Sequence, residues 1–423
     1  MRILQIASGD FFSTYGGGQV YVKNLVDEMI RQNLDVAVVS LIRNGNCDII
    51  EKNYKNSQLI EINSEFNLEE AIKLLHPDII HAHSLKKQAC MIGRNLNIPV
   101  IVTAHHGGIV CPAGSCINKN DEICTATVTH INCLPCVLRN SRGGKLIYPI
   151  IKIIPEKFFI SLGRRLSRIP FIPFITPYGS SALYIKDKKD EWHTIATLCT
   201  LLIAPSYKIG EALLANGLPA EKLRIIPHGV PVPALHPKTK TDRNGNLNFY
   251  YTGRICYIKG IHVLLKAFAN INQNNIRLHI IGSSGNEHER KYMLKLQKEY
   301  AYDSRIIWHG KILPEDIYNR TVDFHICVSP TICLEVYGLN IAEALALGKP
   351  VLVTRCGGAE MQVIDGKNGW LVAPNDVQAL ENKIREIAAH PEVSDSMRHN
   401  CQANTITNHV KILSDTYLTL RYK

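Results

Sequence analysis

The sequence lacks the marks of an exported or membrane-spanning protein. Its first residues, MRILQIASGD, have neither the long apolar core nor the small-residue cleavage site of a secretory signal. No apolar stretch reaches the roughly 20 residues that a membrane-spanning helix needs. The chain also has no obvious low-complexity tract or tandem repeat, although its two halves share one βα design. These absences predict a soluble protein of the cytoplasm.

Acidic residues are comparatively few: 37 Asp and Glu stand against 48 Lys and Arg, which gives a net charge of +11. The surface is therefore expected to attract anions such as nucleotide diphosphates, nucleic acid or anionic lipid. The chain has 423 residues, more than one core usually supports, so two domains are expected. Because no export signal is present, the 13 cysteines favour free thiols or metal ligands over disulfides.

Short apolar segments of β character alternate with helical patterns along the whole chain. In the first half they cover residues 2–7, 35–41, 77–83, 99–103 and 201–205, and the alternation restarts at residues 247–254. The prolines, lysines and glycine of residues 231–246 indicate a linker between the halves. This spacing predicts an α/β protein with a doubly wound parallel sheet in each half.

Residues 326–354, ICVSPTICLEVYGLNIAEALALGKPVLVT, have the pattern of a strand, a loop, a helix and a second strand. Gly338 permits the turn, and Asn340 is placed to cap a helix with Glu343 at its third position. The loop would open at the carboxyl end of a parallel strand, where open α/β sheets bind ligands. Glu335 and Glu343 can accept hydrogen bonds from a hydroxyl-rich ligand there; alternatively, Glu343 only caps the helix and Glu335 is a solvated acid.

Residues suited to ligand binding also follow two strands of the first half. Gly16, Gly17 and Gly18 precede a helical pattern, which lets backbone amides approach an anion. The spacing is not GxGxxG, and glycines also serve plain turns. His105 follows the strand at 99–103, where an imidazole can donate to a sugar or move a proton; the alternative is a structural histidine.

Two cations lie in the loop after the strand at 247–254. Arg254 and Lys259 are placed to grip a diphosphate, the arginine through its fork and the lysine as a point charge. The alternative is a pair of ordinary surface cations.

A loop at residues 111–136 concentrates cysteines. Four thiolates can enclose Zn²⁺, and a loop with few large apolar residues would gain stability from such a metal. Reduced cysteines without metal are the alternative, because the spacing is not a regular paired CxxC pattern. The candidate ligands are Cys111, Cys116, Cys124, Cys133 and Cys136.

Residues 145–189 are basic and apolar together. Lysines and arginines are interleaved with Ile, Phe and Leu, which suits a surface lying on anionic lipid. Prolines at 155, 170 and 173 favour short amphipathic pieces over one long helix. A buried segment with snorkelling basic side chains fits the same composition.

Several motifs follow one another in a fixed order. The glycine loop is followed by T-x-H at Thr103 and His105, IIPHGV at 225–230, G-R-x4-KG at 253–260, E-x7-E at Glu335 and Glu343, and then GKPVLVT, CGGAE and DGKNGWLV. This ordered set resembles the GT-B glycosyltransferases of the large retaining family 4 over nearly the whole chain.

The resemblance implies two Rossmann-like domains that face each other across a cleft. Residues 1–230 would form the acceptor-side domain, 231–246 the linker and 247–404 the donor-binding domain. Residues 405–423 would form a helix that crosses back to the first domain.

The resemblance also implies how a nucleotide-sugar donor is held. Arg254 and Lys259 would neutralise the diphosphate and stabilise the departing nucleotide. Glu343 would bind the ribose, Glu335 the transferred sugar, and His105 would donate to a sugar hydroxyl. Catalytic roles fall to His105, Glu335, Arg254 and Lys259, and the donor-binding set is Gly17, Gly18, Gly253, Arg254, Lys259, Gly310, Lys311, Glu335, Tyr337, Gly338, Leu339, Asn340 and Glu343.

The expected chemistry requires no cofactor for catalysis. The sequence has no Asp-x-Asp clamp, so cations would do what Mg²⁺ does in other transferases. We expect transfer from a UDP- or GDP-sugar to a lipid-linked or oligosaccharide acceptor in surface polysaccharide or glycolipid assembly, in peripheral contact with the inner face of the plasma membrane. A sugar-nucleotide epimerase and a catalytically silent sugar-nucleotide-binding scaffold are the alternatives. No nucleic-acid partner is expected, because only the charge fits one.

Overall fold

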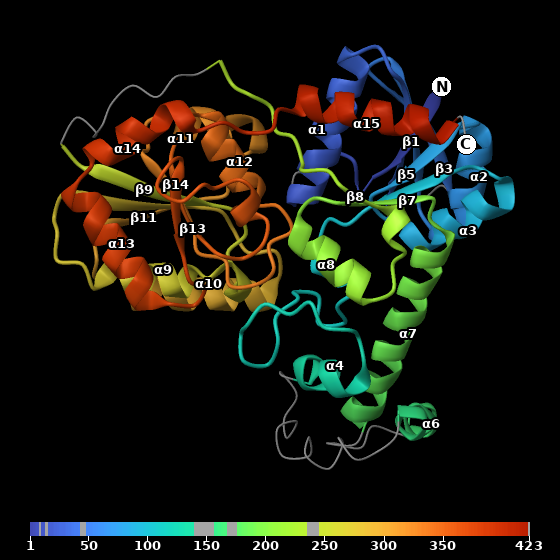
Figure 1. Ribbon diagram of the computed structural model, residues 1–423, viewed down its shortest axis with the longest axis horizontal. Coiled ribbons are helices and arrows are strands. Elements are labelled where there is room, and N and C mark those ends of the chain that lie inside the picture. Colours follow the sequence, from blue (N-terminus) through green and yellow to red (C-terminus); the bar gives the residue numbers. More distant parts are fainter. Residues whose placement is uncertain are drawn as a thin grey trace.

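The chain folds into two α/β domains that lie side by side, each built on its own sheet (Figure 1). The computed structural model describes residues 1–7, 10–12, 16–42, 48–138, 156–166, 176–234 and 245–421. Strands and helices alternate in both halves, so the predicted pair of doubly wound sheets is confirmed. The linker prediction at 231–246 and the basic segment at 145–189 lie partly outside the described residues.

The N-terminal sheet has eight strands in the order β3-β4-β2-β1-β5-β6-β7-β8, all parallel except the β3–β4 pair. Its central strand β1 pairs with β2 on one side and β5 on the other. The strands are β1 (Arg2–Ile6), β2 (Asp35–Leu41), β3 (Ile49–Tyr54), β4 (Ser57–Ile62), β5 (Ile79–Ala82), β6 (Val100–Thr103), β7 (Leu201–Ala204) and β8 (Leu223–Ile225).

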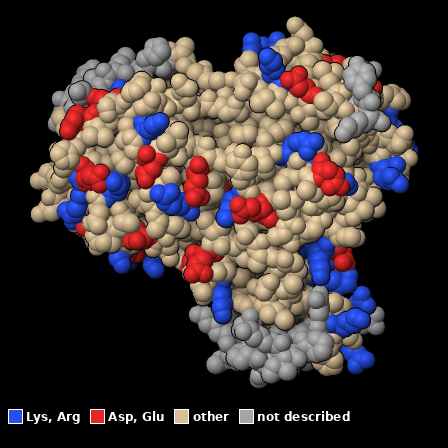
Figure 2. Space-filling view, viewed as in Figure 1, with Lys and Arg blue, Asp and Glu red and all other residues tan. Residues whose placement is uncertain are grey.

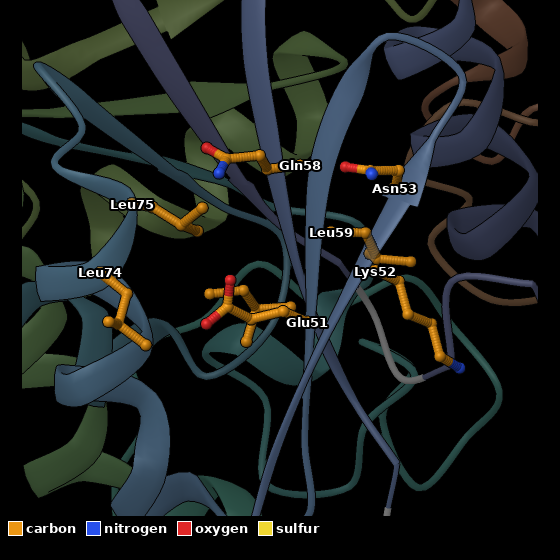
Figure 3. A pocket seen from close by; sticks show the side chains of 8 residues that line it. Glu51, Lys52, Asn53, Gln58, Leu59, Leu74 and Leu75 are labelled. Atoms are coloured by element: carbon orange, nitrogen blue, oxygen red, sulfur yellow. The ribbon is translucent and has the colours of Figure 1, made fainter.

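The β3–β4 hairpin was missed by the sequence analysis, which placed helices between residues 41 and 77. Its strand β3 is polar and largely exposed, with Glu51, Lys52 and Asn53 facing solvent, so it shows no apolar run. A pocket lies where this hairpin meets α2 (Leu68–Leu75), lined by Glu51, Lys52, Asn53, Gln58, Leu59, Ile60, Leu74 and Leu75 (Figure 3). The pocket contains no predicted site residue.

The C-terminal sheet has six parallel strands in the order β11-β10-β9-β12-β13-β14. The strand order reverses direction at β9, because β10 and β12 lie on its two sides. Such a switch point is where open α/β sheets bind ligands. The strands are β9 (Leu247–Thr252), β10 (Ile276–Ile281), β11 (Ile306–Gly310), β12 (Ile326–Ser329), β13 (Val351–Thr354) and β14 (Gly369–Val372).

The helices cover both sheets, and the last one lies on the first domain (Figure 1). Helix α15 packs Val410, Leu413 and Tyr417 into the cluster formed by β1 and α1. In the N-terminal half the other helices are α1 (Gly17–Arg31), α3 (Lys86–Leu96), α4 (His130–Val137), α6 (Glu156–Leu166), α7 (Thr176–Leu198) and α8 (Tyr207–Ala215). In the C-terminal half they are α9 (Ile261–Ala269), α10 (Glu287–Glu299), α11 (Ile317–Thr321), α12 (Leu339–Ala346), α13 (Val377–Ala389), α14 (Glu392–Met397) and α15 (Ile406–Arg421).

Helix α7 projects from the N-terminal domain and carries α4 and α6 near its far end (Figure 1). On the face shown in Figure 2, acidic and basic side chains are intermixed over the body of the molecule, and Lys and Arg gather toward this projection. None of the described helices is both long and apolar enough to cross a membrane.

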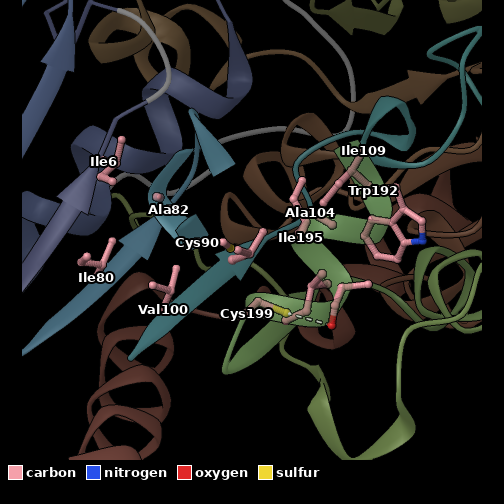
Figure 4. Close-up of a cluster of buried hydrophobic side chains, with 14 of the residues drawn as sticks. Ile6, Ile80, Ala82, Cys90, Val100, Ala104, Ile109, Trp192, Ile195 and Cys199 are labelled. Atoms are coloured by element: carbon pink, nitrogen blue, oxygen red, sulfur yellow. Dashed lines mark hydrogen bonds between the residues drawn. The ribbon is translucent and has the colours of Figure 1, made fainter. Parts of the chain in front are cut away.

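A hydrophobic core under the N-terminal sheet includes side chains from α7 (Figure 4). Trp192 packs there and donates its indole N–H to the carbonyl oxygen of Asn216 at 2.7 Å. Leu334 and Val336, from the C-terminal domain, belong to the same cluster. The loop that carries Glu335 is therefore anchored in the core of the other domain.

Helix α12 begins differently from the expectation. The cap residue is Gly338, at a φ of +87° that side-chain-bearing residues avoid, and no side chain caps the helix. Asn340 lies inside the first turn, and its amide donates instead to the carbonyl oxygen of Thr252 at 3.2 Å. The prediction that Asn340 caps the helix is therefore wrong, because the glycine turns the chain two residues earlier. The amide ties α12 to the end of β9.

A buried lysine stabilises the C-terminal domain. Lys349 is 1% exposed, and its Nζ donates to the carbonyl oxygens of Thr321 at 2.6 Å, Val322 at 2.8 Å and Phe324. These carbonyls follow the end of α11, where a helix leaves acceptors unpaired and favours a cation.

Replacing this lysine is expected to destabilise the domain strongly. Lys349→Met leaves three carbonyl groups without their donor and should lower the free energy of unfolding by about 3 kcal/mol. Chemical denaturation measures the change. The matched control is Lys367→Met at an exposed lysine, and an equal loss in both variants would contradict the role given to Lys349.

Candidate functional site

Three glycines meet at the carboxyl ends of neighbouring strands. Gly253, Gly282 and Gly310 end β9, β10 and β11, and the amide of Gly282 donates to the carbonyl oxygen of Gly310 at 2.8 Å. A Cβ on Gly282 would lie 1.8 Å from the carbonyl oxygen of Gly253, and its φ is +153°. Only glycine therefore lets these backbones approach so closely. Sequence reasoning missed Gly282, although the segment LHIIGSSG was visible; Lys311 follows Gly310 directly.

Lys259 and Glu335 form a short ion pair in which the side chains are 25% and 15% exposed. Burial acts to lower the pKa of Lys259, but the carboxylate of Glu335 raises it above its ordinary value. Gly260 follows at a φ of +70°, and a Cβ there would lie 1.9 Å from the carbonyl oxygen of Pro330. The turn after Lys259 therefore packs directly on the loop that precedes Glu335.

The backbone of Glu335 is held on both sides. Its amide donates to the carbonyl oxygen of Cys356 at 2.8 Å, and its own carbonyl accepts from the amide of Gly358 at 2.8 Å. A Cβ on Gly358 would lie 2.4 Å from the Cα of Tyr337. The CGGAE motif, residues 356–360, therefore holds the loop of residues 335–338 through backbone hydrogen bonds and close backbone packing.

Arg254 keeps about half of its side chain exposed beside α10. Its Nε lies 3.8 Å from a carboxylate oxygen of Glu289, a long ion pair, and its backbone carbonyl accepts from the Tyr251 hydroxyl at 2.8 Å. The backbone is thus fixed, whereas the guanidinium contacts only the thiol of Cys256 and, at long range, Glu289 among the described residues, and an anionic ligand can replace these contacts.

Glu343 lies half-buried on the first turns of α12. Burial raises its pKa to about 7. Tyr250, Tyr318 and Cys327 are its electrostatic neighbours, and within the described ranges its carboxylate has no hydrogen-bond partner. A desolvated carboxylate without donors is suited to accept hydrogen bonds from a ligand's hydroxyl groups.

The glycine loop of the first domain touches the start of α12. A Cβ on Gly17 would lie 3.3 Å from Cδ1 of Leu339, and one on Gly18 would lie 3.9 Å from the ring of His105. Gly17 and Gly18 thus lie between the predicted donor-side residues and the imidazole that follows β6.

His105 belongs to a group of aromatic side chains at the domain boundary. Its ring is stacked on His228 with centroids 5.2 Å apart, and His228 meets Tyr337 edge-on at 5.6 Å. Burial, together with neighbouring imidazoles and Lys86, holds the pKa of His105 well below its usual range. His228 was not singled out as a site residue, although it lies in the IIPHGV motif.

The cysteine loop brings thiols near one another without completing a metal site. A hydrogen bond with the thiol of Cys116 lowers the pKa of Cys111 to about 6. Burial raises the pKa of Cys133 to about 12, and the Cys111, Cys136 and Cys124 thiols lie close enough to add to it. No group of three or more His, Cys, Asp or Glu in the described part of the chain is placed to hold a metal ion. Structural zinc stays a prediction, which elemental analysis of protein purified without chelator tests.

Several of the predicted donor-binding residues lie where the two domains meet. Lys259, Glu335, Asn340 and Glu343 come from loops after β9 and β12 and from α12, while Gly17, Gly18 and His105 come from the first domain. An ion pair, an unpartnered carboxylate, an open arginine and an imidazole can together bind a diphosphate joined to polyhydroxylated groups.

Comparison with known proteins agrees with this arrangement. The family model described as Glycosyl transferases group 1 matches residues 235–406, and that described as Glycosyltransferase Family 4 matches residues 15–114. The capsular polysaccharide biosynthesis glycosyltransferase CapM of Staphylococcus aureus is 29% identical over 58% of this chain and 64% of its own. A lipopolysaccharide 1,2-N-acetylglucosaminetransferase of Salmonella typhimurium is 28% identical over 45% of this chain and 54% of its own. The matched segments thus span about half to two thirds of these curated relatives.

Solved structures match over the whole length. The sucrose-phosphate synthase of Thermosynechococcus elongatus has a TM-score of 0.70 at 20% identity and covers 99% of both chains. HepE of Anabaena, solved with UDP-glucose, has a TM-score of 0.66 at 14% identity, with 99% of this chain and all of the other covered. Because the two family models together match more than half of the chain and the fold agrees throughout, the chain belongs to the GT-B glycosyltransferases of the family 4 type.

Proposed function

We propose that the protein transfers a sugar from a UDP- or GDP-sugar to a lipid-linked or oligosaccharide acceptor with retention of the anomeric configuration. The observation that carries the proposal is the Lys259–Glu335 ion pair together with the carboxylate of Glu343 on α12, the helix whose first residue, Leu339, contacts the glycine loop next to His105. These groups match the diphosphate, sugar and ribose of such a donor. HepE, which shares the fold, was solved with UDP and with UDP-glucose.

Each group has a defined task in this mechanism. Arg254 and Lys259 bind the diphosphate and stabilise the negative charge that grows as the bond from phosphate oxygen to anomeric carbon breaks. Glu335, released from Lys259 by the diphosphate, accepts hydrogen bonds from hydroxyls of the transferred sugar. Glu343 accepts from the ribose hydroxyls, and Gly17 and Gly18 bring backbone amides to the phosphates.

The acceptor attacks from the face that the nucleotide leaves. Its hydroxyl oxygen forms the new bond to the anomeric carbon, and its proton passes to the departing phosphate oxygen, so no metal and no protein nucleophile is needed. The backbone after Gly310, including Lys311, reads the base, and His105 contacts a sugar hydroxyl. The names of CapM and of the Salmonella transferase favour an acceptor in surface polysaccharide assembly.

Donor recognition is tested by thermal stability. The protein is heated with UDP-, GDP- and ADP-sugars in turn. The true donor, at 100 times its Kd, should stabilise the folded protein by about 2.7 kcal/mol and raise its Tm. The selected donor is then incubated with a lipid extract, and the anomeric configuration of the product is read by NMR. If no nucleotide sugar raised the Tm, or the product were inverted, the proposed function would be wrong.

Contact with an anionic membrane surface is the second part of the proposal. Helix α6 exposes Lys157, Arg164 and Arg165 together with Phe158, which is 58% exposed. This helix lies near the end of the projection formed by α7 (Figure 1), and Figure 2 shows Lys and Arg side chains gathered toward that projection. A basic and apolar surface on a projecting helix suits lipid headgroups.

Sedimentation with vesicles measures this contact. Binding to vesicles that contain phosphatidylglycerol should weaken as salt rises, because the attraction is electrostatic. Exchanging Arg164 and Arg165 for glutamine should remove most of it, while Lys298→Gln, at an exposed lysine on α10, serves as the control. Equal sedimentation of both variants would contradict the proposal that α6 contacts the membrane.

A further inference from the structure

A chain of buried hydrogen bonds runs from His105 into the interior of the N-terminal domain. His83, after β5, places Nδ1 2.7 Å from Nε2 of His105 and Nε2 2.8 Å from Oε1 of Gln5 on β1. The amide nitrogen of Gln5 lies 3.3 Å from the hydroxyl of Tyr417 on α15 and 3.6 Å from the sulfur of Met29. Gln5 and Tyr417 are fully buried, and His83 is 2% exposed.

The amide of Gln5 fixes the direction of the first two hydrogen bonds. Its nitrogen faces the sulfur of Met29, which can only accept, and the hydroxyl of Tyr417, which can accept, so its oxygen faces His83 and can only accept. Nε2 of His83 must therefore carry the proton. Burial keeps the pKa of His83 well below its usual range, so the ring is neutral and its Nδ1 is an acceptor. Nε2 of His105 must then donate.

Nδ1 is the remaining ring nitrogen of His105. Within the part of the chain that the structure describes, its Nδ1 has no hydrogen-bond partner. Gly18 and the ring of His228 lie beside it, at the boundary with the donor-binding domain. A neutral ring with its proton on Nε2 presents only a lone pair at Nδ1.

We propose that Gln5 and His83 are positioning residues that hold His105 in the Nε2–H tautomer, so that its Nδ1 accepts a hydrogen bond from a hydroxyl of the transferred sugar. The identity of the hydroxyl rests on the proposed function. The assignment of the tautomer does not depend on that function. It reverses the direction expected from the sequence, in which His105 would donate.

Other titratable groups surround His83 and His105. His81 is directed away from the site, since its two ring nitrogens contact the hydroxyls of Tyr417 at 2.7 Å and Thr103 at 2.7 Å. The groups that face His83 and His105 are His81, His106, His228, Tyr21 and Lys86. His409 and Tyr417 lie one contact further away, on Tyr21 and His81. Lys86 donates to the carbonyl oxygen of His83 at 2.7 Å and so disfavours a second positive charge there.

The tautomer is measured directly by ¹⁵N NMR of protein labelled at histidine. The signal of His105 is assigned by its loss in His105→Asn. The wild-type protein should show a protonated Nε2 and a lone-pair Nδ1 at neutral pH. A protonated Nδ1 would overturn the proposal, whether or not any variant folds and whether or not the protein transfers sugar.

Gln5→Met tests the positioning role, because it keeps the volume and removes the acceptor for His83. The His105 signal should shift toward a mixture of tautomers, and kcat for sugar transfer should fall about tenfold, the loss typical of one hydrogen bond to the substrate. KM for the donor should change less than kcat.

Met29→Leu is the matched control, since the hydroxyl of Tyr417, at 3.3 Å, still accepts from the Gln5 amide nitrogen and Met29 offers His83 no acceptor. Its spectrum and kcat should equal those of the wild type. An unchanged His105 tautomer in folded Gln5→Met would refute the positioning role. A changed tautomer with unchanged kcat would refute only the contact between Nδ1 and the sugar.

Discussion

Lys259→Met is expected to abolish sugar transfer and to destabilise the protein. Transfer should fall by about 10³-fold, because the cation that faces the departing diphosphate is lost. Stability should fall by about 3–5 kcal/mol, because the buried carboxylate of Glu335 loses its counter-charge. Among the described residues, the other side-chain hydrogen bond of Glu335 comes from the hydroxyl of Thr331 at 3.4 Å. Kinetic assays and chemical denaturation measure the two effects.

The double variant separates the two effects. Replacing Glu335 by glutamine in the Lys259→Met background removes the unpaired charge, so most of the stability should return while transfer stays absent. Lys266→Met, at an exposed lysine on the following helix α9, should change neither quantity. Transfer that recovered together with stability would show that Lys259 acts only in folding.

Glu343→Gln is expected to make the protein more stable and less able to bind its donor. Burial raises the pKa of this carboxyl to about 7, so the folded state resists its ionisation while the unfolded state does not. The free energy of unfolding is therefore highest below the ordinary pKa of the carboxyl. It falls as the pH rises toward 7 and stays low at higher pH. The shift from 4.5 corresponds to about 3 kcal/mol.

The pH dependence of the stability gain shows whether the gain comes from removing the charge of Glu343 or from repacking of its side chain. Compared with wild type, Glu343→Gln should gain about 3 kcal/mol more at pH 8 than at pH 4, where both side chains are neutral. Donor affinity of the wild type should rise between pH 6 and 8, because the ionised carboxylate accepts both ribose hydroxyls. Glu315→Gln, at an exposed turn, is the control, and a gain independent of pH would contradict the role of charge.

The strands could be predicted from the sequence because most of them are apolar and end at glycine, proline or polar residues. The strands β2 and β13 have the predicted bounds, Asp35–Leu41 and Val351–Thr354. The hairpin β3–β4 was missed because a polar edge strand leaves no periodic signal. Asn340 was misplaced because a capping pattern is compatible with several starts, whereas the φ of Gly338 selects one.

Part of the site could be predicted from the sequence because its charged residues follow predicted strands. Lys259 and Glu335 were both chosen from their positions, but their pairing depends on how two loops pack and leaves no mark in the spacing. His83 and Gln5 look like ordinary residues of buried strands. Their relation to His105 arises only when β1, β5 and β6 become neighbours in the sheet, so no motif could have revealed it.

The position of α15 has a consequence for the order in which the protein is made. Tyr417 reaches Gln5 across 412 positions of the sequence, and the chain beside α15 pairs Val230 with Thr405. A ribosome therefore releases β1 and its sheet long before the helix that completes their core exists. The apolar surface of α1 and β1 therefore stays uncovered until the second domain and α15 have been synthesised. Nascent chains stalled before residue 406 should therefore be held by chaperones.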